Sequence, residues 1–351
     1  MSRETLRAAV DLLLGSRERD RLLWFTGGEP LLEFPSLRWA IAYAEAACPA
    51  RRQARFGLST NGLLLDDERA DFLAAHRVTT QLSFDGLPAA QDRRRPGSFG
   101  PLDACLRSLR RRHPRWFARD VEVAVTVTGA NLSVLADSVA YFLARGVRTV
   151  SVAPQVTCDR QWTRSSYLDL ARQLGSVFAA SVRLYRRTGL VPVTFLRRPA
   201  PNGSGASASE RLCGIGTGRT LTVDVDGSVA GCVMLAESYQ TFSTPLLRDR
   251  VAALRLGRLD EPGLSRRLAS FPDALDAAAL FDGRSRKRSS FGRCRDCRHR
   301  GSCSICPVSI GRIPGNADPD RVPDVVCGFN RIALEYRDRF PARATGPGPR
   351  C

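Results

Sequence analysis

The sequence predicts an α/β fold built on parallel strands, followed by a smaller cysteine-rich region. In the first half, short apolar runs with strand character alternate with amphipathic helical segments, and small or polar residues follow each run. This alternation implies right-handed crossovers between parallel strands, as in a doubly wound sheet or an α/β barrel. The expected strands are residues 22–26, 53–59, 79–84, 121–128 and 147–152. The expected helices between them are residues 36–47, 66–75, 102–112 and 134–145.

The composition is that of a folded protein with room for two domains. The chain has 351 residues, of which 43% are hydrophobic, so it can bury a sizeable core. Its formal net charge is +18, but almost all of the basic residues are arginine, and Lys287 is the only lysine. Because the arginines are spread along the chain rather than clustered on one element, nucleic-acid binding is not favoured. Attraction to an acidic peptide segment is equally compatible with this charge.

The sequence carries no sign of a membrane span or a secretion signal. No run of about 18 apolar residues occurs, and residues 1–20 lack the uninterrupted apolar region and small-residue cleavage site of a signal peptide. They predict a helix entered through Ser2, with Glu4 in its first turn. We therefore expect a cytoplasmic protein. In that reducing compartment, eleven cysteines indicate metal ligation or chemistry rather than a disulfide framework.

Four of the expected strands end in loops rich in glycine, asparagine and acidic residues. The loops read TGGEP at residues 26–30, STNG at 59–62, SFDG at 83–86 and TVTGAN at 126–131. In α/β folds the carboxyl edge of the strands is where ligands bind. These residue types are also ordinary turn formers, so one such loop alone would mean little. Four of them at successive strand ends favour a ligand site.

A change of composition marks an expected domain boundary. A helix is expected at residues 166–187 and a short strand at 191–196. Next comes RRPAPNGSGASASE at residues 197–210, whose Pro, Gly and Ser content predicts a linker. Further on, the basic stretch DGRSRKRSSFGR at residues 282–293 is expected to be solvated surface rather than a binding site.

Seven cysteines gather in the second half of the chain. The first two, Cys213 and Cys232, bracket a predicted β-hairpin of residues 220–225 and 228–233 with a DG turn between its strands. A C-x-x-C pair lets two thiolates converge on one metal centre from a single turn. The segments CRDCRHRGSCSIC and VVCGFN supply the other five, which are Cys294, Cys297, Cys303, Cys306 and Cys327.

The spacing of these cysteines favours iron-sulfur clusters over zinc. Zinc ribbons usually separate their two pairs by a longer loop, whereas only five residues lie between Cys297 and Cys303. Three cysteines beyond one tetrahedral set also need a role, and two clusters, one with a non-cysteine ligand, fit the count better. Zinc is the alternative. The cysteines outside this spacing are expected to be packing or tail residues, and they are Cys48, Cys105, Cys158 and Cys351.

Together these motifs resemble the radical S-adenosylmethionine (radical SAM) enzymes that carry a SPASM domain. The resemblance rests on GGEPLL, STNG and SFDG in the first half and on the cysteine hairpin with its C-x-x-C-rich tail, and it covers residues 1–340. It implies a partial (β/α)6 TIM-type barrel at residues 1–196, the linker at 197–210, a SPASM auxiliary-cluster domain at 211–340 and a tail at 341–351.

The resemblance also implies a cofactor site at the strand ends. Glycines let a backbone approach a ligand closely, and a carboxylate at a strand's end accepts from an ammonium group, here the methionine amino group of S-adenosylmethionine. No catalytic residue is assigned. The residues that match cofactor-binding or pocket positions of the family are Gly27, Gly28, Glu29, Pro30, Ser59, Asn61, Ser83, Asp85 and Arg95.

In the tail, the resemblance implies two auxiliary [4Fe-4S] clusters. Only two residues separate Cys303 from Cys306, one fewer than the family usually has. An open iron position would suit direct ligation of a cysteine-bearing peptide. The ligands of the first cluster would be Cys294, Cys297, Cys303 and Cys327. Part of the second would be held, with its fourth position unidentified, by Cys213, Cys232 and Cys306.

One motif of the family does not occur in this sequence. Family members carry a C-x-x-x-C-x-x-C loop a few tens of residues before the GGEP motif, and its thiolates bind the cluster that cleaves S-adenosylmethionine. Here no cysteine precedes Cys48. We expect either that Met1 is an internal methionine of a longer gene product, which is the interpretation we prefer, or that the chain is a degenerate relative acting as a non-catalytic peptide-binding partner.

The resemblance implies a peptide-modifying oxidoreductase. Its 5′-deoxyadenosyl radical would abstract hydrogen from a ribosomally made peptide or a protein side chain, to form for example a thioether or a carbon-carbon cross-link. Sulfatase maturation ranks lower, because Val233 stands where those relatives carry an acidic base. Expected partners are the peptide or protein substrate, a flavodoxin or ferredoxin as reductant, and a separate leader-peptide recognition protein. The least favoured alternative is a zinc-containing nucleic-acid binder.

Overall fold

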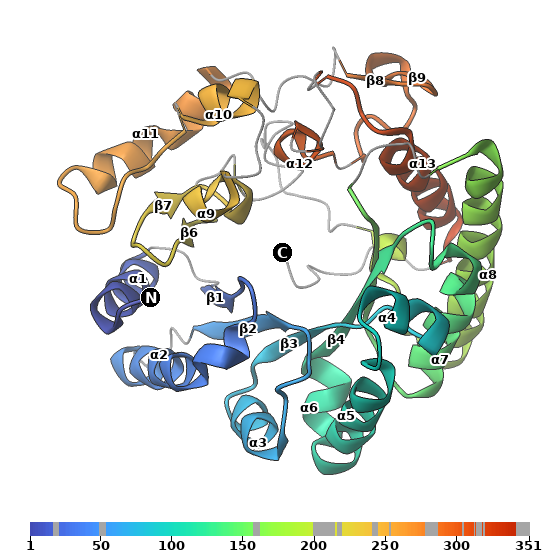
Figure 1. The fold of residues 1–351 in the computed structure, drawn as a ribbon, viewed down its shortest axis with the longest axis horizontal. Helices are drawn as coiled ribbons and strands as arrows, with labels where there is room; N and C mark the ends of the chain where they lie inside the picture. The colour runs from blue at the N-terminus through green and yellow to red at the C-terminus, as the bar shows by residue number, and fades with distance from the viewer. Residues whose placement is uncertain are drawn as a thin grey trace.

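A five-stranded parallel β-sheet forms the centre of the fold, in the order β1-β2-β3-β4-β5 (Figure 1). The strands are β1 (Leu22–Phe25), β2 (Arg55–Thr60), β3 (Thr79–Ser83), β4 (Val121–Val127) and β5 (Val150–Pro154). A parallel bridge between Val150 and Val193 extends the sheet beyond β5. The computed structural model describes residues 1–16, 21–48, 54–156, 162–198, 215, 220–240, 245–252, 254–277, 287–303, 305–311, 313, 318 and 320–341.

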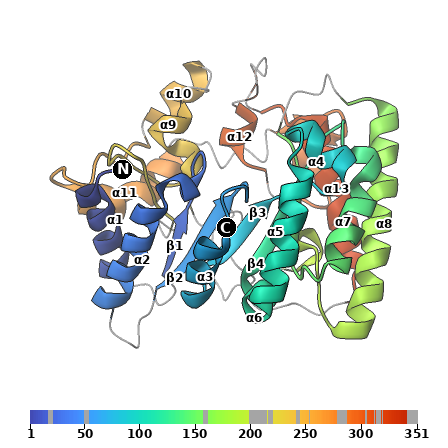
Figure 2. The same ribbon diagram turned by 60° about the horizontal axis from the view of Figure 1, so that its bottom comes forward.

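Helices connect the strands, and most of them lie on the outer side of the curved sheet (Figures 1 and 2). The first begins at the N-cap Ser2, whose hydroxyl accepts the Thr5 N–H at 3.1 Å, as the sequence predicted. Among the described helices, none is both long enough and apolar enough to cross a membrane. In chain order the elements are α1 (Arg3–Gly15), η1 (Pro30–Glu33), α2 (Phe34–Ala47), α3 (Asp67–Ala75), α4 (Pro88–Arg94), α5 (Phe99–Arg112), α6 (Pro114–Asp120), η2 (Leu132–Val134), α7 (Leu135–Ala144), α8 (Arg164–Thr188) and η4 (Thr194–Leu196).

The two faces of the sheet differ in chemistry. On the outer face, fully buried residues such as Leu58 and Leu82 pack against the helices in one continuous core. On the inner face, the strand register places Ser59 beside Gln81, and Gln81 beside Glu122. A closed α/β barrel fills this interior with packed branched side chains, whereas polar and small residues line it here. The inner face is therefore suited to surround a ligand rather than to form a second core.

The structure confirms the α/β prediction and corrects several boundaries. The first four strands agree with the expected ranges within two residues at each end. β5 begins at Val150 rather than at residue 147, because the Val147 N–H donates to the Phe142 carbonyl at 3.1 Å and so closes the turn after α7. The strand expected at residues 191–196 is wrong beyond its single bridge at Val193, since the following residues form the 3-10 turn η4.

The sequence analysis missed two short helices, α4 and α6. Each carries a proline at its start, Pro88 or Pro114, where the missing N–H has no intrahelical partner to lose. That proline is the signal that could have found them. Both helices are only seven residues long, which is too short for a clear amphipathic period.

The C-terminal half forms a second group of short elements around a hydrophobic cluster of its own. The expected hairpin is present but shorter than predicted, and its Val229 packs with Phe271 and Val308. In chain order the elements are β6 (Thr222–Val223), β7 (Val229–Ala230), η6 (Val233–Leu235), α9 (Glu237–Gln240), α10 (Pro245–Ala252), α11 (Leu264–Ala277), β8 (Arg288–Ser289), β9 (Gly292–Arg293), η8 (Cys294–Asp296), α12 (Pro307–Gly311) and α13 (Asp324–Arg339).

Helix α13 ties the C-terminal half to the barrel. It packs on α8 and η4, and Figure 1 shows it lying along α8. Its Val325, Phe329 and Ala333 belong to the same buried core as the sheet. The boundary expected at residues 197–210 stays a prediction, because residues 199–210 lie outside the described ranges. The same holds for the tail expected at residues 341–351, of which only Pro341 is described.

Gly86, in the SFDG loop, is a position where the fold itself requires glycine. Its φ is +120°, and a Cβ there would lie 2.1 Å from the Ser138 Cβ on α7. Gly86→Ala should therefore lower the free energy of unfolding by about 2–4 kcal/mol. Gly97→Ala is the matched control, since its φ is +74° but nothing lies within 4 Å of its Cβ, and we expect a cost of about 1 kcal/mol. Urea denaturation measures both, and equal costs would contradict the close packing of this loop on α7.

Candidate functional site

The loop after β1 presents two glycines at the carboxyl edge of the sheet. Gly27 has a φ of +142°, which favours glycine, whereas Gly28 lies outside the positive-φ region. Both residues are exposed, and a Cβ built on either would meet no atom within 4 Å. Among the described residues, no atom lies close enough to obstruct a side chain at either position. The loop therefore leaves room for a ligand to approach its peptide groups, as the sequence predicted.

Glu29 fastens this loop to the end of the neighbouring strand β2. Its Oε1 accepts the Thr60 hydroxyl at 2.7 Å and the Leu31 N–H at 3.1 Å, and its Oε2 accepts the Asn61 N–H at 2.8 Å. A carboxylate offers about four acceptor positions, so the fold itself uses three of them. Glu29 thus holds the glycine loop in place and keeps one position for a ligand's donor. Pro30 follows it as the first residue of η1.

Thr60, which the sequence analysis passed over, is the buried partner in this arrangement. Its hydroxyl donates to Glu29 and accepts the Gly62 N–H at 3.0 Å. Asn61 beside it uses its Oδ1 to accept the Leu63 N–H at 2.9 Å, so its side chain shapes the turn after β2. The position of Thr60 between two predicted site residues of the STNG loop was the available signal.

A row of polar side chains crosses the inner face of the sheet below these loops. The Ser59 hydroxyl accepts from Trp24 Nε1 at 3.1 Å and donates to Gln81 Oε1 at 3.3 Å. The indole ring of Trp24 lies over Gly57, where a Cβ would come within 2.3 Å of the ring. Ser59 is therefore on the inner wall, and its contact with a cofactor or substrate stays a prediction. Trp24 and Gln81 are wall residues that the sequence analysis missed.

Asp85 joins the ends of β3 and β4. It is only 4% exposed, and its Oδ1 accepts the Thr126 N–H at 2.9 Å and Arg94 Nη1 at 3.4 Å. Its own N–H donates to the Gln91 side chain at 2.8 Å. Burial raises the pKa of the Asp85 carboxyl, and the Thr126 hydrogen bond and the Arg94 charge oppose that rise. Asp85 therefore fixes the loop geometry at the carboxyl edge.

The remaining two predicted pocket residues lie nearby but differ in their placement. Ser83 is the last residue of β3 and pairs with Ala124 on the inner face. Arg95 is exposed and ends α4 as its C-cap. The arginine that reaches Asp85 is Arg94, one residue earlier. Contact of Arg95 with a ligand stays a prediction.

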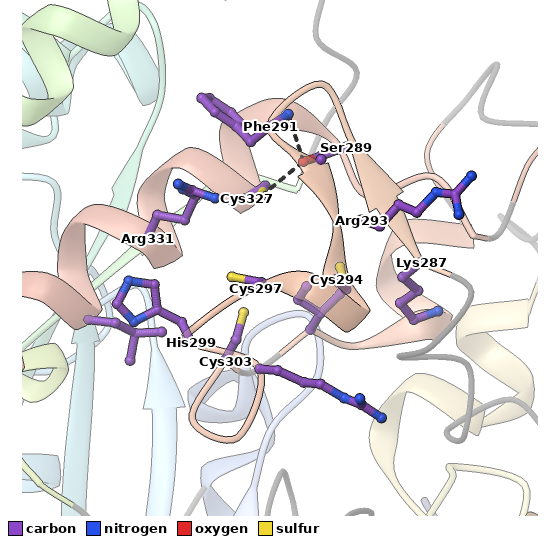
Figure 3. Close-up of a pocket in the computed structure, with 14 residues that line it drawn as sticks. Lys287, Ser289, Phe291, Arg293, Cys294, Cys297, His299, Cys303, Cys327 and Arg331 are labelled. Atoms are coloured by element: carbon purple, nitrogen blue, oxygen red, sulfur yellow. Dashed lines mark hydrogen bonds between the residues drawn. The ribbon is translucent and has the colours of Figure 1, made fainter.

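Four of the predicted cysteine ligands line one pocket in the C-terminal half (Figure 3). Turns bring three of them together: the Cys297 N–H donates to the Cys294 carbonyl at 3.2 Å, and the Cys303 N–H donates to His299 at 2.8 Å. Helix α13 supplies the fourth, Cys327, from its buried first turns. The resemblance assigned one cluster to four cysteines, and the structure places all of them around one pocket: Cys294, Cys297, Cys303 and Cys327.

Polar and basic residues surround this pocket. Ser289 of β8 donates to Cys327 Sγ at 3.1 Å, and Lys287 is only 3% exposed. Burial raises the pKa of the Cys327 thiol, and the Ser289 hydrogen bond and the Arg331 charge oppose that rise. The prediction that residues 282–293 are only solvated surface is wrong for this part, since residues from 287 onward form the hairpin β8-β9 and line the pocket.

The lining of this pocket bears on which metal group its four cysteines could hold. Zinc needs all of its sulfur ligands at about 2.3 Å from one point. Within the described part of the chain, no three His, Cys, Asp or Glu side chains lie close enough to share one ion. The thiols instead surround a cavity of about 40 Å³, roughly three times the space that one water molecule requires. Four cysteines are the usual donor set of a [4Fe-4S] cluster, so the lining of this pocket is compatible with one.

The second predicted set is only partly described. Cys232 precedes η6 and Cys306 precedes α12, and these two turns pack together. The Ser309 N–H donates to Cys306 Sγ at 3.4 Å. Cys213 lies outside the described residues, so its convergence with the other two stays a prediction.

The cysteines predicted to have no ligand role are described only in part. Cys105 packs against the barrel core, and burial raises the pKa of its thiol to about 11, as suits a packing residue. Cys48 is half-buried at the end of α2. Cys158 and Cys351 lie outside the described residues.

Solved structures share this fold over nearly the whole chain. The structure of anSMEcpe with bound AdoMet and the Kp18Cys peptide matches with a TM-score of 0.68 over 97% of this chain and 89% of that chain, at 16% identity. SuiB from Streptococcus suis bound to S-adenosylmethionine matches with a TM-score of 0.51 over 93% of this chain and 68% of that chain, also at 16% identity. SuiB bound to the precursor peptide SuiA matches with a TM-score of 0.52 at 14% identity, over the same shares of the two chains.

These matches confirm the predicted fold class, a partial barrel followed by a cysteine-rich region. They also confirm the resemblance to radical SAM enzymes with a SPASM domain at the level of the fold. No family model matches the sequence. At these identities the matches establish architecture, and the chemistry of the site has to be argued from the residues of this chain.

The Glu29 clamp can be tested by removing one of its acceptor positions. Glu29→Gln would turn an N–H₂ group toward one of three donors, so we expect the free energy of unfolding to fall by about 1–3 kcal/mol. Glu33→Gln, an exposed residue of the same turn, should change it by less than about 0.5 kcal/mol. Chemical denaturation compares the two variants. Similar values would show that Glu29 does not hold the loop.

Proposed function

We propose that this chain is a radical SAM enzyme of the SPASM type that modifies a ribosomally made peptide or a protein side chain. It binds S-adenosylmethionine at the carboxyl edge of the sheet and carries auxiliary [4Fe-4S] clusters on its C-terminal cysteines. The observation that carries the proposal is the pocket formed by Cys294, Cys297, Cys303 and Cys327, on a fold shared with AdoMet-bound anSMEcpe. The open glycine loop after β1 supports the same function.

The residues at the carboxyl edge have distinct tasks in this proposal. The peptide groups of Gly27 and Gly28 meet the methionine end of the cofactor, because no side chain blocks their approach. Glu29 holds that loop against Thr60 and Asn61 and has one acceptor position left for an ammonium group. Hydrogen-atom abstraction would be supplied by the cofactor together with a reducing cluster, whose C-x-x-x-C-x-x-C ligands this sequence does not contain. The polar inner wall around Ser59 and the other pocket residues Ser83, Asp85 and Arg95 would orient the substrate and cofactor.

A peptide is the proposed substrate class. The matching structures hold the Kp18Cys peptide on anSMEcpe and the precursor peptide SuiA on SuiB. Sulfatase maturation ranks lower here, because Val233, at the start of η6 after Cys232, has an aliphatic side chain that cannot accept a proton. A flavodoxin or ferredoxin as reductant, and a separate leader-peptide recognition protein, belong to the same proposal.

Metal content tests the cluster assignment. After anaerobic reconstitution, we expect about eight irons per chain with matching sulfide, and Cys327→Ser should lose about four of them because one four-cysteine site loses a ligand. Cys105→Ser is the control, since Cys105 packs in the barrel core, and it should keep its iron. Zinc without iron would overturn the proposal and bring the zinc-containing nucleic-acid binder forward.

A substitution at Gly28 can test ligand binding without disturbing the fold. Because a Cβ there meets no protein atom and φ is not positive, Gly28→Val should leave the thermal midpoint within about 2 °C of the parent. The side chain should nevertheless weaken S-adenosylmethionine binding at least tenfold, because it occupies the space where the ligand approaches the peptide groups. Isothermal titration calorimetry measures the affinity. Gly100→Ala, an open position on α5, should bind normally, and unchanged binding by Gly28→Val would place the cofactor elsewhere.

A further inference from the structure

The pocket formed by Cys294, Cys297, Cys303 and Cys327 receives a hydroxyl donor whose direction is fixed. Ser289 Oγ accepts the Phe291 N–H at 3.2 Å and lies 3.1 Å from Cys327 Sγ (Figure 3). Because the backbone N–H occupies a lone pair of the hydroxyl, the Ser289 hydrogen is left to point at the sulfur. The hairpin itself is held beside α13, since the Ser290 N–H donates to Asp324 at 2.8 Å. The position of the Ser289 hydroxyl is therefore fixed by backbone hydrogen bonds of the hairpin.

A second donor comes from the helix that carries Cys327. Asn330 lies three residues later on α13, on the same side of the helix, and its Nδ2 donates to Cys303 Sγ at 3.5 Å. One helix thus supplies a thiol to the pocket and a hydrogen bond to a second thiol. Ser289 and Asn330 are not themselves candidate metal ligands. Each donates a hydrogen bond to the sulfur of a cysteine that is one.

Positive charge is also concentrated at this pocket. Lys287, the only lysine of the chain, is 3% exposed and lines the pocket, and its Nζ lies 3.9 Å from Asp320 Oδ1. Arg331 lines the pocket from α13, with its guanidinium 5.6 Å from the centre of the Phe291 ring. Burying an ammonium group is costly unless negative charge compensates it. Asp320 supplies negative charge to Lys287, and thiolates around the pocket would add to it.

We propose that Ser289 and Asn330, together with Lys287 and Arg331, raise the reduction potential of the cluster held by the four cysteines, so that this cluster accepts an electron more readily than it would without them. The inference rests on the proposed function, because it needs a [4Fe-4S] cluster at the site. Reduction adds one electron and hence one negative charge to the cluster and its thiolates. Hydrogen bonds to the sulfurs and nearby cations stabilise the reduced form more than the oxidised form.

A redox titration of the reconstituted full-length chain tests this directly. Electron paramagnetic resonance follows the signal of the reduced cluster while dithionite sets the potential. Ser289→Ala removes one donor and should lower the equilibrium ratio of reduced to oxidised cluster about threefold at a given potential. The double variant with Asn330→Leu should lower it about tenfold, which is about 59 mV for a one-electron couple. The second cluster should keep its potential in both variants.

Matched control variants distinguish a change in the reduction potential of the cluster from a loss of the cluster site. Ser289→Thr keeps the hydroxyl and should restore the parent potential, and Ser290→Ala, an exposed neighbour that bonds through its backbone N–H, should not change it. If Ser289→Ala does not retain its iron, Asn330→Leu and Lys287→Met each carry the same prediction independently.

The outcomes distinguish the inference from the proposed function. A fully loaded cluster whose potential is the same in the parent, Ser289→Ala, Asn330→Leu and Lys287→Met would overturn the inference and leave the proposed function standing. Failure of the parent chain to load iron at these cysteines would overturn both. A lowered potential in the variants, restored in Ser289→Thr, would support the inference.

Discussion

The parallel pairing of the five strands is the constraint on which the candidate site at the carboxyl edge of the sheet depends. Because all strands run the same way, the loops after β1, β2 and β3 meet at one edge of the sheet. Glu29 from the first loop can then reach Thr60 and Asn61 from the second, and Asp85 can reach the backbone of Thr126. Each carboxylate spans two strand ends and satisfies donors that the turns leave open. The open backbone at Gly27 and Gly28 is held between these fixed points.

The same constraint extends to the cysteine pocket through α13. This helix buries Val325 and Phe329 in the barrel core, so the thiol of Cys327 is placed by packing that involves the sheet. The other three cysteines sit on short turns, which by themselves bury little apolar surface. Their geometry is set instead by backbone hydrogen bonds around Cys294 and His299 and by the β8-β9 hairpin. The larger core therefore gives rigidity to the cysteine pocket.

The sequence predicted those features that depend on local spacing. Strand alternation and the N-cap at Ser2 follow from short-range patterns, and the structure agrees with both. The grouping of Cys294, Cys297, Cys303 and Cys327 came from the family resemblance, and these four residues line one pocket. Contacts between distant segments could not be predicted in this way. Ser289 reaches Cys327 across 38 positions and Glu29 reaches Asn61 across 32. A single serine or threonine carries no pattern that would single it out before the chain is folded.

The misassigned elements have similar causes. The basic stretch at residues 282–293 was expected to be solvated because its charge suggested surface, yet its later part forms the hairpin that carries Ser289. The apolar run at residues 191–196 contains a single bridge at Val193 and then forms a 3-10 turn. The guanidinium of Arg197, which follows this turn, donates to the Thr149 hydroxyl at 2.9 Å. The composition of these segments indicated whether they are basic or apolar, but it did not indicate which residues they contact in the fold.

The most direct measurement is a crystal structure of the anaerobically reconstituted chain with S-adenosylmethionine, with anomalous diffraction recorded at the iron edge. We expect a compact group of iron atoms among the sulfurs of Cys294, Cys297, Cys303 and Cys327, and the methionine end of the cofactor against Gly27 and Gly28. A single zinc ion among those sulfurs, or a cofactor bound away from the glycine loop, would contradict the assignment of both sites.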